Sequence, residues 1–120
     1  MKVFNITDDS YTNEIENYYG KVLIDFFADW CTPCKMLSPI IEDVAWKTSG
    51  RVKVCKINVE NEKELAQKFG VMSIPTLIVM ENGKVESYPM SAASVVLKPN
   101  DRILIYTGDY NHISIIVARD

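Results

Sequence analysis

The stretch DFFADWCTPCK, residues 25–35, decides how this chain is expected to fold, because a strand pattern changes there into a helix pattern. KVLIDFFA (residues 21–28) is a nearly continuous apolar run, which predicts a central β-strand covered on both faces. Apolar residues then recur at helical spacing over residues 31–47: Met36, Leu37, Ile40, Ile41, Val44 and Ala45. The sequence therefore places two cysteines, Cys31 and Cys34, at the start of a helix that follows a buried strand.

Strands and helices alternate over the first 90 residues. The other predicted elements are a short strand at 2–6, a helix at 6–20, a strand at 51–60, a helix at 61–70, and a hairpin at 76–88 turning at Asn82-Gly83. The first helix is expected to use Thr7 or Asp8 as its cap and to bury one face: Tyr11, Ile15, Tyr18 and Tyr19. Such alternation requires crossover connections, so we expect an α/β fold with a central mixed sheet and helices on both faces.

The pattern changes after residue 90. SVVL, RILIY and ISIIVA are rich in β-branched and aliphatic residues, and the turn-forming stretches KPND and TGDYNH separate them. No amphipathic helix is predicted in this part. We therefore expect residues 91–120 to form an atypical β-rich tail of the same domain as residues 1–90.

Composition excludes several classes of protein. The chain has 120 residues, of which 48% are hydrophobic and 24% charged, as expected for one ordinary globular domain. The net charge is −3 and the lysines are scattered, so no nucleic-acid partner is expected. No apolar run reaches the length of a membrane span, so we expect no membrane partner. The first ten residues lack the pattern of a secretory signal, which favours a cytoplasmic protein.

The Cys31-Cys34 pair could bind a metal, fasten the fold or undergo redox chemistry. Structural zinc normally takes four ligands in two closely spaced pairs. The remaining donors are Cys55, inside an apolar strand, and His112, in the tail. A Cys3His set is numerically available, but the second pair lacks the required spacing. We therefore expect no metal, and we interpret Cys55 as a small buried hydrophobic residue.

Redox chemistry explains the position of the pair better than a structural bond does. A disulfide that closes so short a loop removes little chain entropy and stabilises weakly. Cys31 at a helix N-terminus would be favoured as a thiolate by free amide groups and the helix dipole. An exposed Cys31 thiolate could attack the disulfide of another protein, and Cys34, one turn later, could resolve the resulting mixed disulfide.

Asp25 is unusual in a central strand, because burying an unpaired carboxylate is costly. It could lie at a strand kink or face the surface. Alternatively, it is a buried acid with a raised pKa that exchanges a proton with Cys34. Lys56, on a neighbouring predicted strand, could tune Asp25 or could be an ordinary lysine at the rim of the sheet.

Three segments of the chain, VLIDFFADWCTPCKMLSPIIEDVA, VCKINVE and FGVMSIPTLIVMENGK, resemble the thioredoxin family in content, order and spacing. The resemblance covers about residues 1–90, and WCxPCK followed by IPT is highly specific. It implies a thioredoxin fold and a protein dithiol–disulfide oxidoreductase that reduces client proteins through a reversible Cys31-Cys34 disulfide, without a cofactor. It also implies a flavin- and NADPH-dependent thioredoxin reductase as partner, since the chain has no Gly-rich dinucleotide loop.

The resemblance also implies roles for individual residues. Cys31 would be the nucleophile, Cys34 the resolving thiol and Asp25 the buried acid, with Lys56 as its tuning residue. Pro75 would follow a cis peptide bond facing the disulfide, although a trans proline is the commoner state of X-Pro bonds. The expected contact surface for substrates consists of Trp30, Thr32, Pro33, Met72, Ser73, Ile74 and Pro75.

The chain departs from the family pattern at several positions. Phe27 replaces a common tryptophan, Thr32 replaces the commoner glycine between the cysteines, and Ser91 replaces a glycine near the active site. The largest departure is residues 91–120, where the family ends with an amphipathic helix. This tail could fold back, cause self-association by pairing with a second chain, or reflect a changed reading frame. The alternative function is therefore a thioredoxin-fold binding or assembly subunit; an oxidase or isomerase would need an oxidising compartment.

Overall fold

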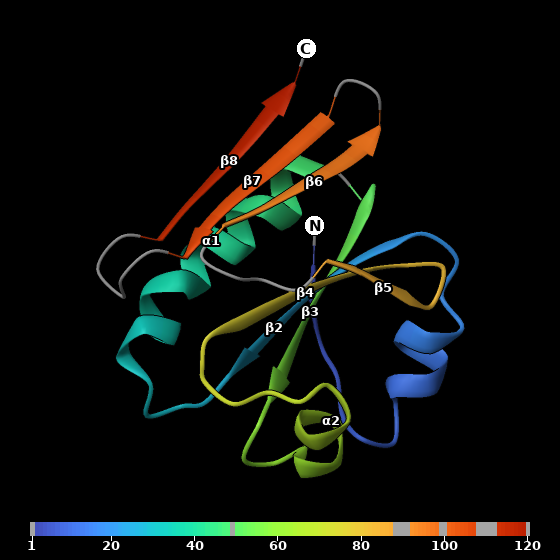
Figure 1. Ribbon diagram of the computed structural model, residues 1–120, viewed down its shortest axis with the longest axis vertical. Helices are drawn as coiled ribbons and strands as arrows, with labels where there is room; N and C mark the ends of the chain where they lie inside the picture. The colour runs from blue at the N-terminus through green and yellow to red at the C-terminus, as the bar shows by residue number, and fades with distance from the viewer. Residues whose placement is uncertain (1, 49, 88–91, 99–100, 108–112, 120) are drawn as a thin grey trace.

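The computed structural model describes residues 2–48, 50–87, 92–98, 101–107 and 113–119 (Figure 1). The elements are β1 (Val3–Asn5), η1 (Thr12–Glu16), β2 (Lys21–Phe27), α1 (Thr32–Thr48), β3 (Val52–Asn58), α2 (Lys63–Lys68), β4 (Thr76–Glu81), β5 (Lys84–Ser87), β6 (Ala92–Lys98), β7 (Asp101–Thr107) and β8 (Ile113–Arg119). Among these residues, no helix is both long and apolar enough to cross a bilayer.

The central sheet has the strand order β1-β3-β2-β4-β5. Strands β1, β3 and β2 run parallel, whereas β4 is antiparallel to β2 and β5 is antiparallel to β4. Helix α1 covers one face, and η1 and α2 lie on the other (Figure 1). This arrangement confirms the predicted α/β class with a mixed sheet.

Strand β2 lies in the middle of this sheet. Its successive side chains point alternately to the two faces, and each face has its own hydrophobic core. Leu23 packs with the inward residues of α1, whereas Ile24 and Phe26 pack with residues of η1 and α2. Because side chains alternate along a strand, Asp25 points to the same face as Leu23, toward α1. The fold thus places a carboxylate under the helix that begins beside Cys31.

The predicted helix over residues 6–20 is wrong in its extent. The structure forms only the short π-helix η1, preceded by a turn in which the Thr7 hydroxyl accepts a hydrogen bond from the Ser10 amide at 3.1 Å. Asp8 instead caps a different helix, because its carboxylate accepts a hydrogen bond from the Leu65 amide in α2 at 3.1 Å.

Two apolar side chains that the helical patterns predicted as buried are exposed. Tyr19 is 87% exposed, because η1 ends at Glu16 and the helical repeat does not reach it. Met36 is 49% exposed and lies outside the buried face of α1, which is formed by Leu37, Ile41, Val44 and Ala45. The first error extended a helix too far along the chain, and the second made the buried face of a helix too wide.

The predicted hairpin turn is confirmed. Asn82 and Gly83 have φ angles of 52° and 79°, in the left-handed region that a tight hairpin turn requires. The Asn82 side chain accepts a hydrogen bond from the Gly20 amide at 2.9 Å, and the Asn82 amide donates to the Gly20 carbonyl at 3.0 Å. The turn between β4 and β5 is therefore joined to the start of β2.

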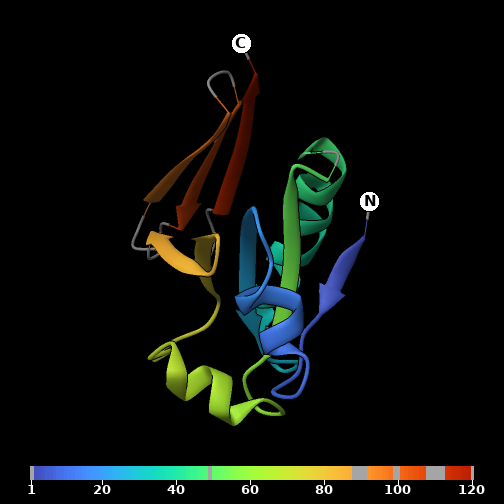
Figure 2. The ribbon, with the colours of Figure 1, turned by 90° about the vertical axis from the view of Figure 1, so that its right-hand side faces the viewer.

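The β-rich tail is also present, as a separate sheet. Strands β6, β7 and β8 form an antiparallel sheet in that order (Figures 1 and 2). Strand β8 contacts α1, so the tail folds back on the helix that begins directly after Cys31. Ser91 and His112, which the sequence singled out, lie outside the described residues.

Candidate active site: a disulfide at the start of a helix

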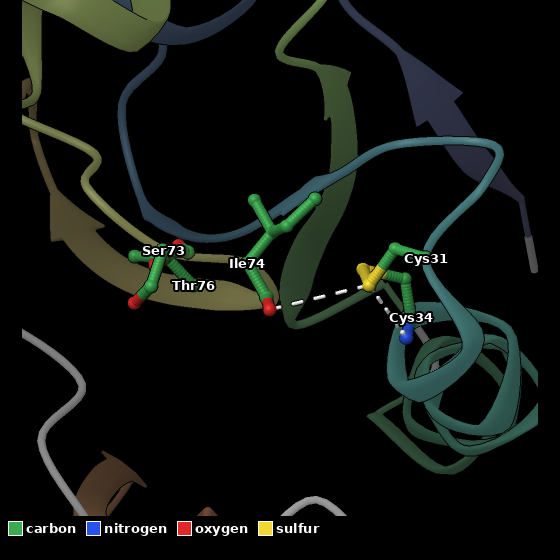
Figure 3. The surroundings of a disulfide bond; sticks show 5 residues. All are labelled: Cys31, Cys34, Ser73, Ile74 and Thr76. Atoms are coloured by element: carbon green, nitrogen blue, oxygen red, sulfur yellow. Dashed lines mark hydrogen bonds between the residues drawn. A yellow bond between two sulfur atoms is a disulfide. The ribbon is translucent and has the colours of Figure 1, made fainter.

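Cys31 and Cys34 form a disulfide at the N-terminus of α1, with their Cα atoms 5.2 Å apart. Helix α1 begins at Thr32, so Cys31 directly precedes its first turn. The Cys34 amide donates a hydrogen bond to Cys31 Sγ at 3.2 Å (Figure 3). After reduction, the same amide and the positive end of the helix dipole favour negative charge on this sulfur.

A loop from the far side of the sheet faces the disulfide. The Ile74–Pro75 peptide bond is cis, as expected from the sequence. The Ile74 carbonyl oxygen points toward the cysteines and lies 4.0 Å from Cys31 Sγ (Figure 3). The Thr76 hydroxyl donates a hydrogen bond to the Ser73 carbonyl, which ties the two ends of this loop together. A backbone acceptor is thus presented beside Cys31 Sγ.

A largely apolar cleft of about 630 Å³ opens beside the disulfide. Its lining residues are Trp30, Cys31, Thr32, Pro33, Val59, Val71, Met72, Ser73 and Ile74. Cys31 is only 3% exposed, so the expectation of an exposed nucleophile is wrong for the oxidised form, because the cleft walls and Cys34 cover its sulfur. Trp30 and Met72, by contrast, are 66% and 97% exposed.

The cleft contains most of the predicted contact residues and two that the sequence analysis missed. Pro75 is absent from its described lining, where Ile74 lies instead. Val59 and Val71 were not predicted, although both are apolar residues in loops: Val59 directly follows β3, and Val71 lies three residues after α2. An apolar residue in such a loop was the only sequence signal that could have marked Val59 and Val71 as contact residues. The chain topology brings both valines to the cleft beside Cys31.

Asp25 is fully buried beneath α1, on the same side of the sheet as Leu23. Neither carboxylate oxygen accepts a hydrogen bond from the residues that the structure describes. Burial raises the pKa of Asp25 from its ordinary 3.8 to about 7, and the charge of Lys56 opposes this rise. Asp25 and Lys56 are register partners across β2 and β3. The carboxyl group can therefore gain or lose a proton near neutral pH.

Cys34 and Lys56 meet at a second, smaller cavity. It has a volume of about 140 Å³ and is lined by Phe27, Ala28, Asp29, Cys34, Lys35, Ser38 and Lys56. Lys56 Nζ donates a hydrogen bond to the Ser38 hydroxyl at 3.2 Å and lies 4.4 Å from the centre of the Phe27 ring. Cys34 therefore borders the cavity that holds the Lys56 ammonium group.

Cys55 takes no part in this site. It is completely buried in the core between the sheet, η1 and α2, and burial raises the pKa of its thiol to about 12. Within the described ranges, no group of three or more His, Cys, Asp or Glu side chains is arranged to hold a metal ion. The interpretation of Cys55 as a small buried hydrophobic residue is confirmed.

The model of the thioredoxin family matches residues 2–99 of the chain. The chain belongs to the thioredoxin family. It is 39% identical over 92 residues to thioredoxin from Pseudomonas aeruginosa, covering 77% of this chain and 85% of the relative. It is 40% identical over 103 residues to thioredoxin from Bacillus subtilis, covering 86% and 92%. It is 42% identical over 80 residues to thioredoxin from Rickettsia bellii, covering 67% and 76%.

Family membership and the disulfide together establish the type of reaction. The chain is a dithiol–disulfide oxidoreductase of the protein-disulfide reductase type, and Cys31-Cys34 is its redox disulfide. Thioredoxins act on proteins that contain disulfides and need no cofactor for this exchange. The family match extends past residue 90 to residue 99, and thus includes β6.

Proposed function

We propose that Cys31 is the attacking thiolate and Cys34 the resolving thiol in the reduction of client proteins. The Cys31 thiolate attacks one sulfur of a client disulfide, which breaks that bond, forms a mixed disulfide and releases the other client sulfur as a thiolate. Cys34 then loses its proton to Asp25 and attacks Cys31 Sγ. This second attack closes the Cys31-Cys34 disulfide and releases the second client thiolate, so the client gains two electrons.

The hydrogen bond from the Cys34 amide to Cys31 Sγ is the observation that carries this assignment. It favours the thiolate at Cys31 rather than at Cys34. Asp25 suits the role of proton acceptor because its pKa of about 7 leaves a substantial carboxylate fraction at neutral pH. Lys56 acts through Asp25 and is a tuning residue in this scheme.

We propose that clients bind as extended segments in the apolar cleft. The Ile74 carbonyl is available for pairing with a client backbone, and Pro75 holds this carbonyl toward the cleft. Trp30, Met72 and the remaining predicted contact residues, Thr32, Pro33 and Ser73, would contact client side chains. The apolar lining favours clients with aliphatic or aromatic residues beside the disulfide.

Electrons would come from a partner, because the sequence contains no Gly-rich dinucleotide loop. The partner we propose is a flavin- and NADPH-dependent thioredoxin reductase, which would make the chain a step in electron transport and in cell redox homeostasis. A cytoplasmic location suits this direction, since a reducing compartment keeps protein thiols reduced.

Serine variants test the assignment of the cysteines in an assay of insulin-disulfide reduction. Cys31→Ser should abolish turnover and form no mixed disulfide. Cys34→Ser should also abolish turnover but accumulate a covalent complex with the client, visible on a non-reducing gel. The control is Cys55→Ser, which should retain turnover because Cys55 lies in the opposite core. Equal activity in the two active-site variants would contradict the assigned roles.

We propose that residues 1–90 form the thioredoxin-like domain and residues 91–120 a tail of that same domain that can mediate self-association. The strand-rich tail presents sheet edges, which pair readily with a second chain. Sizing chromatography of the full chain should therefore show a concentration-dependent dimer. A monomer at every concentration would contradict self-association. If the double Cys31→Ser, Cys34→Ser variant keeps its biological activity, the chain serves instead as a binding subunit.

A further inference from the structure

Ser38 lies on α1 one turn after Cys34 and is half-buried beside the small cavity. Its hydroxyl oxygen accepts a hydrogen bond from Lys56 Nζ at 3.2 Å. This contact is not part of the reaction scheme above, yet it joins the helix that carries Cys34 to Lys56, the residue paired in register with Asp25. The hydrogen bond between Ser38 and Lys56 therefore helps to fix the position of the Lys56 charge.

Lys56 has a stronger acceptor close by than a serine hydroxyl. Both oxygens of Asp25 lack hydrogen-bond partners among the described residues, and a charged pair is stronger than a bond to a neutral hydroxyl. The ammonium nevertheless lies on Ser38 and 4.4 Å from the centre of the Phe27 ring. These two contacts hold the charge within the cavity, where it acts on Asp25 only at a distance.

The position of the Lys56 charge matters because an ammonium in direct contact with Asp25 would stop Asp25 from exchanging a proton near neutral pH. A direct ion pair would hold Asp25 as a carboxylate at neutral pH, and it would then be a weaker base. The other groups near Asp25 do not replace Lys56 as its partner. From α1 come Cys34 and the exposed Lys35, Asp29 follows β2, and the register partner on β4 is the apolar Leu77.

We propose that Ser38 is a positioning residue, whose hydroxyl holds the Lys56 ammonium beside the Asp25 carboxyl group and prevents a direct ion pair. This inference rests on the proposed function, in which Asp25 takes the proton of Cys34. Ser38 touches no client and neither sulfur in this scheme. It acts through Lys56, and its effect is to keep Asp25 able to accept and release a proton near neutral pH.

Titration of Asp25 tests the proposal without depending on turnover. The protein is labelled with ¹³C-aspartate and kept oxidised, so that Cys31 and Cys34 do not titrate with Asp25. The Asp25 carboxyl signal is identified by its loss in Asp25→Asn. In Ser38→Ala the released ammonium should move onto the carboxylate, and the titration midpoint should fall by about one pH unit.

Two further variants separate positioning from a general loss of structure. Ser38→Thr restores the hydroxyl and should return the midpoint toward its wild-type value. Ser10→Ala removes another half-buried serine hydroxyl, which is hydrogen-bonded to Thr7. Because this pair lies far from Ser38 in the sequence, the variant should leave the midpoint unchanged. A midpoint in Ser38→Ala that is unchanged or raised would overturn the proposal, as would a failure of Ser38→Thr to restore it.

The proposed role of Asp25 is tested separately by the rate at which the mixed disulfide resolves. If Asp25→Asn resolves it as fast as wild type at every pH, the proton-transfer role of Asp25 is wrong, whatever the titration of Ser38→Ala shows. If Asp25→Asn is slow but the Ser38→Ala midpoint does not fall, the role of Asp25 stands and the positioning by Ser38 is wrong. With both effects present, Ser38→Ala should also shift the pH dependence of resolution to lower pH.

Discussion

Replacing Asp25 by alanine should stabilise the oxidised protein, and the gain should grow as the pH rises. Burial raises the pKa of Asp25 from 3.8 to about 7, so the folded protein binds more protons than the unfolded chain between about pH 4 and pH 7. The free energy of unfolding of the wild type must therefore fall through this window as the pH increases, and this contribution is constant above it. Asp25→Ala lacks this dependence.

The size of the effect follows from the same two pKa values. A rise from 3.8 to about 7, at about 1.4 kcal/mol for each pH unit, corresponds to about 4 kcal/mol. The penalty is about 1 kcal/mol at pH 4.5 and close to its full value at pH 8.5, which leaves a difference of about 3 kcal/mol. The cavity that alanine leaves has a cost that does not depend on pH, so it cancels from the comparison.

Urea unfolding at pH 4.5 and 8.5, followed by tryptophan fluorescence, measures this difference. The gain of Asp25→Ala over wild type should be larger by about 3 kcal/mol at the higher pH. The control is Asp43→Ala, which removes an exposed carboxylate from an ion pair with Lys47 and should change stability by less than about 1 kcal/mol at either pH. If the gain of Asp25→Ala is the same at both pH values, Asp25 is not a buried acid of raised pKa.

Two substitutions and one labelling experiment test the fold away from the site. Gly83→Ala should cost about 1 to 3 kcal/mol in urea unfolding, since φ is +79° and an added Cβ would lie 2.6 Å from the Glu16 carbonyl oxygen; a neutral effect would contradict the turn. Asp8→Ala should cost about 1 kcal/mol, because the Leu65 amide loses its acceptor, and it should leave the reductase rate unchanged. Cys55 should resist iodoacetamide at pH 8 in the folded, reduced protein and react in urea, and labelling without urea would refute its burial.

Long, strongly patterned elements were predictable from the sequence. The apolar run of β2 and the helical repeat of α1 reflect burial on two faces and on one face respectively, and burial leaves a direct trace in residue order. The hairpin turn was predictable because Asn82 and Gly83 tolerate positive φ angles. The length of the first helix was not, since η1 ends at Glu16 although the apolar pattern continues to Tyr18 and Tyr19, and Tyr18 packs against the core from outside the helix.

The sequence by itself determined the chemistry of this protein: two cysteines at the junction of a strand and a helix, a carboxylate in a buried strand and an Ile-Pro pair further along the chain. Only the tertiary structure decided which distant residues surround them. Val59 and Val71 line the cleft, and Ser38 holds Lys56, because crossovers and strand pairing bring together segments that are separate in the chain. Local pattern indicates most buried positions, although it misplaced Tyr19 and Met36, whereas the partners of a residue depend on how whole elements pack.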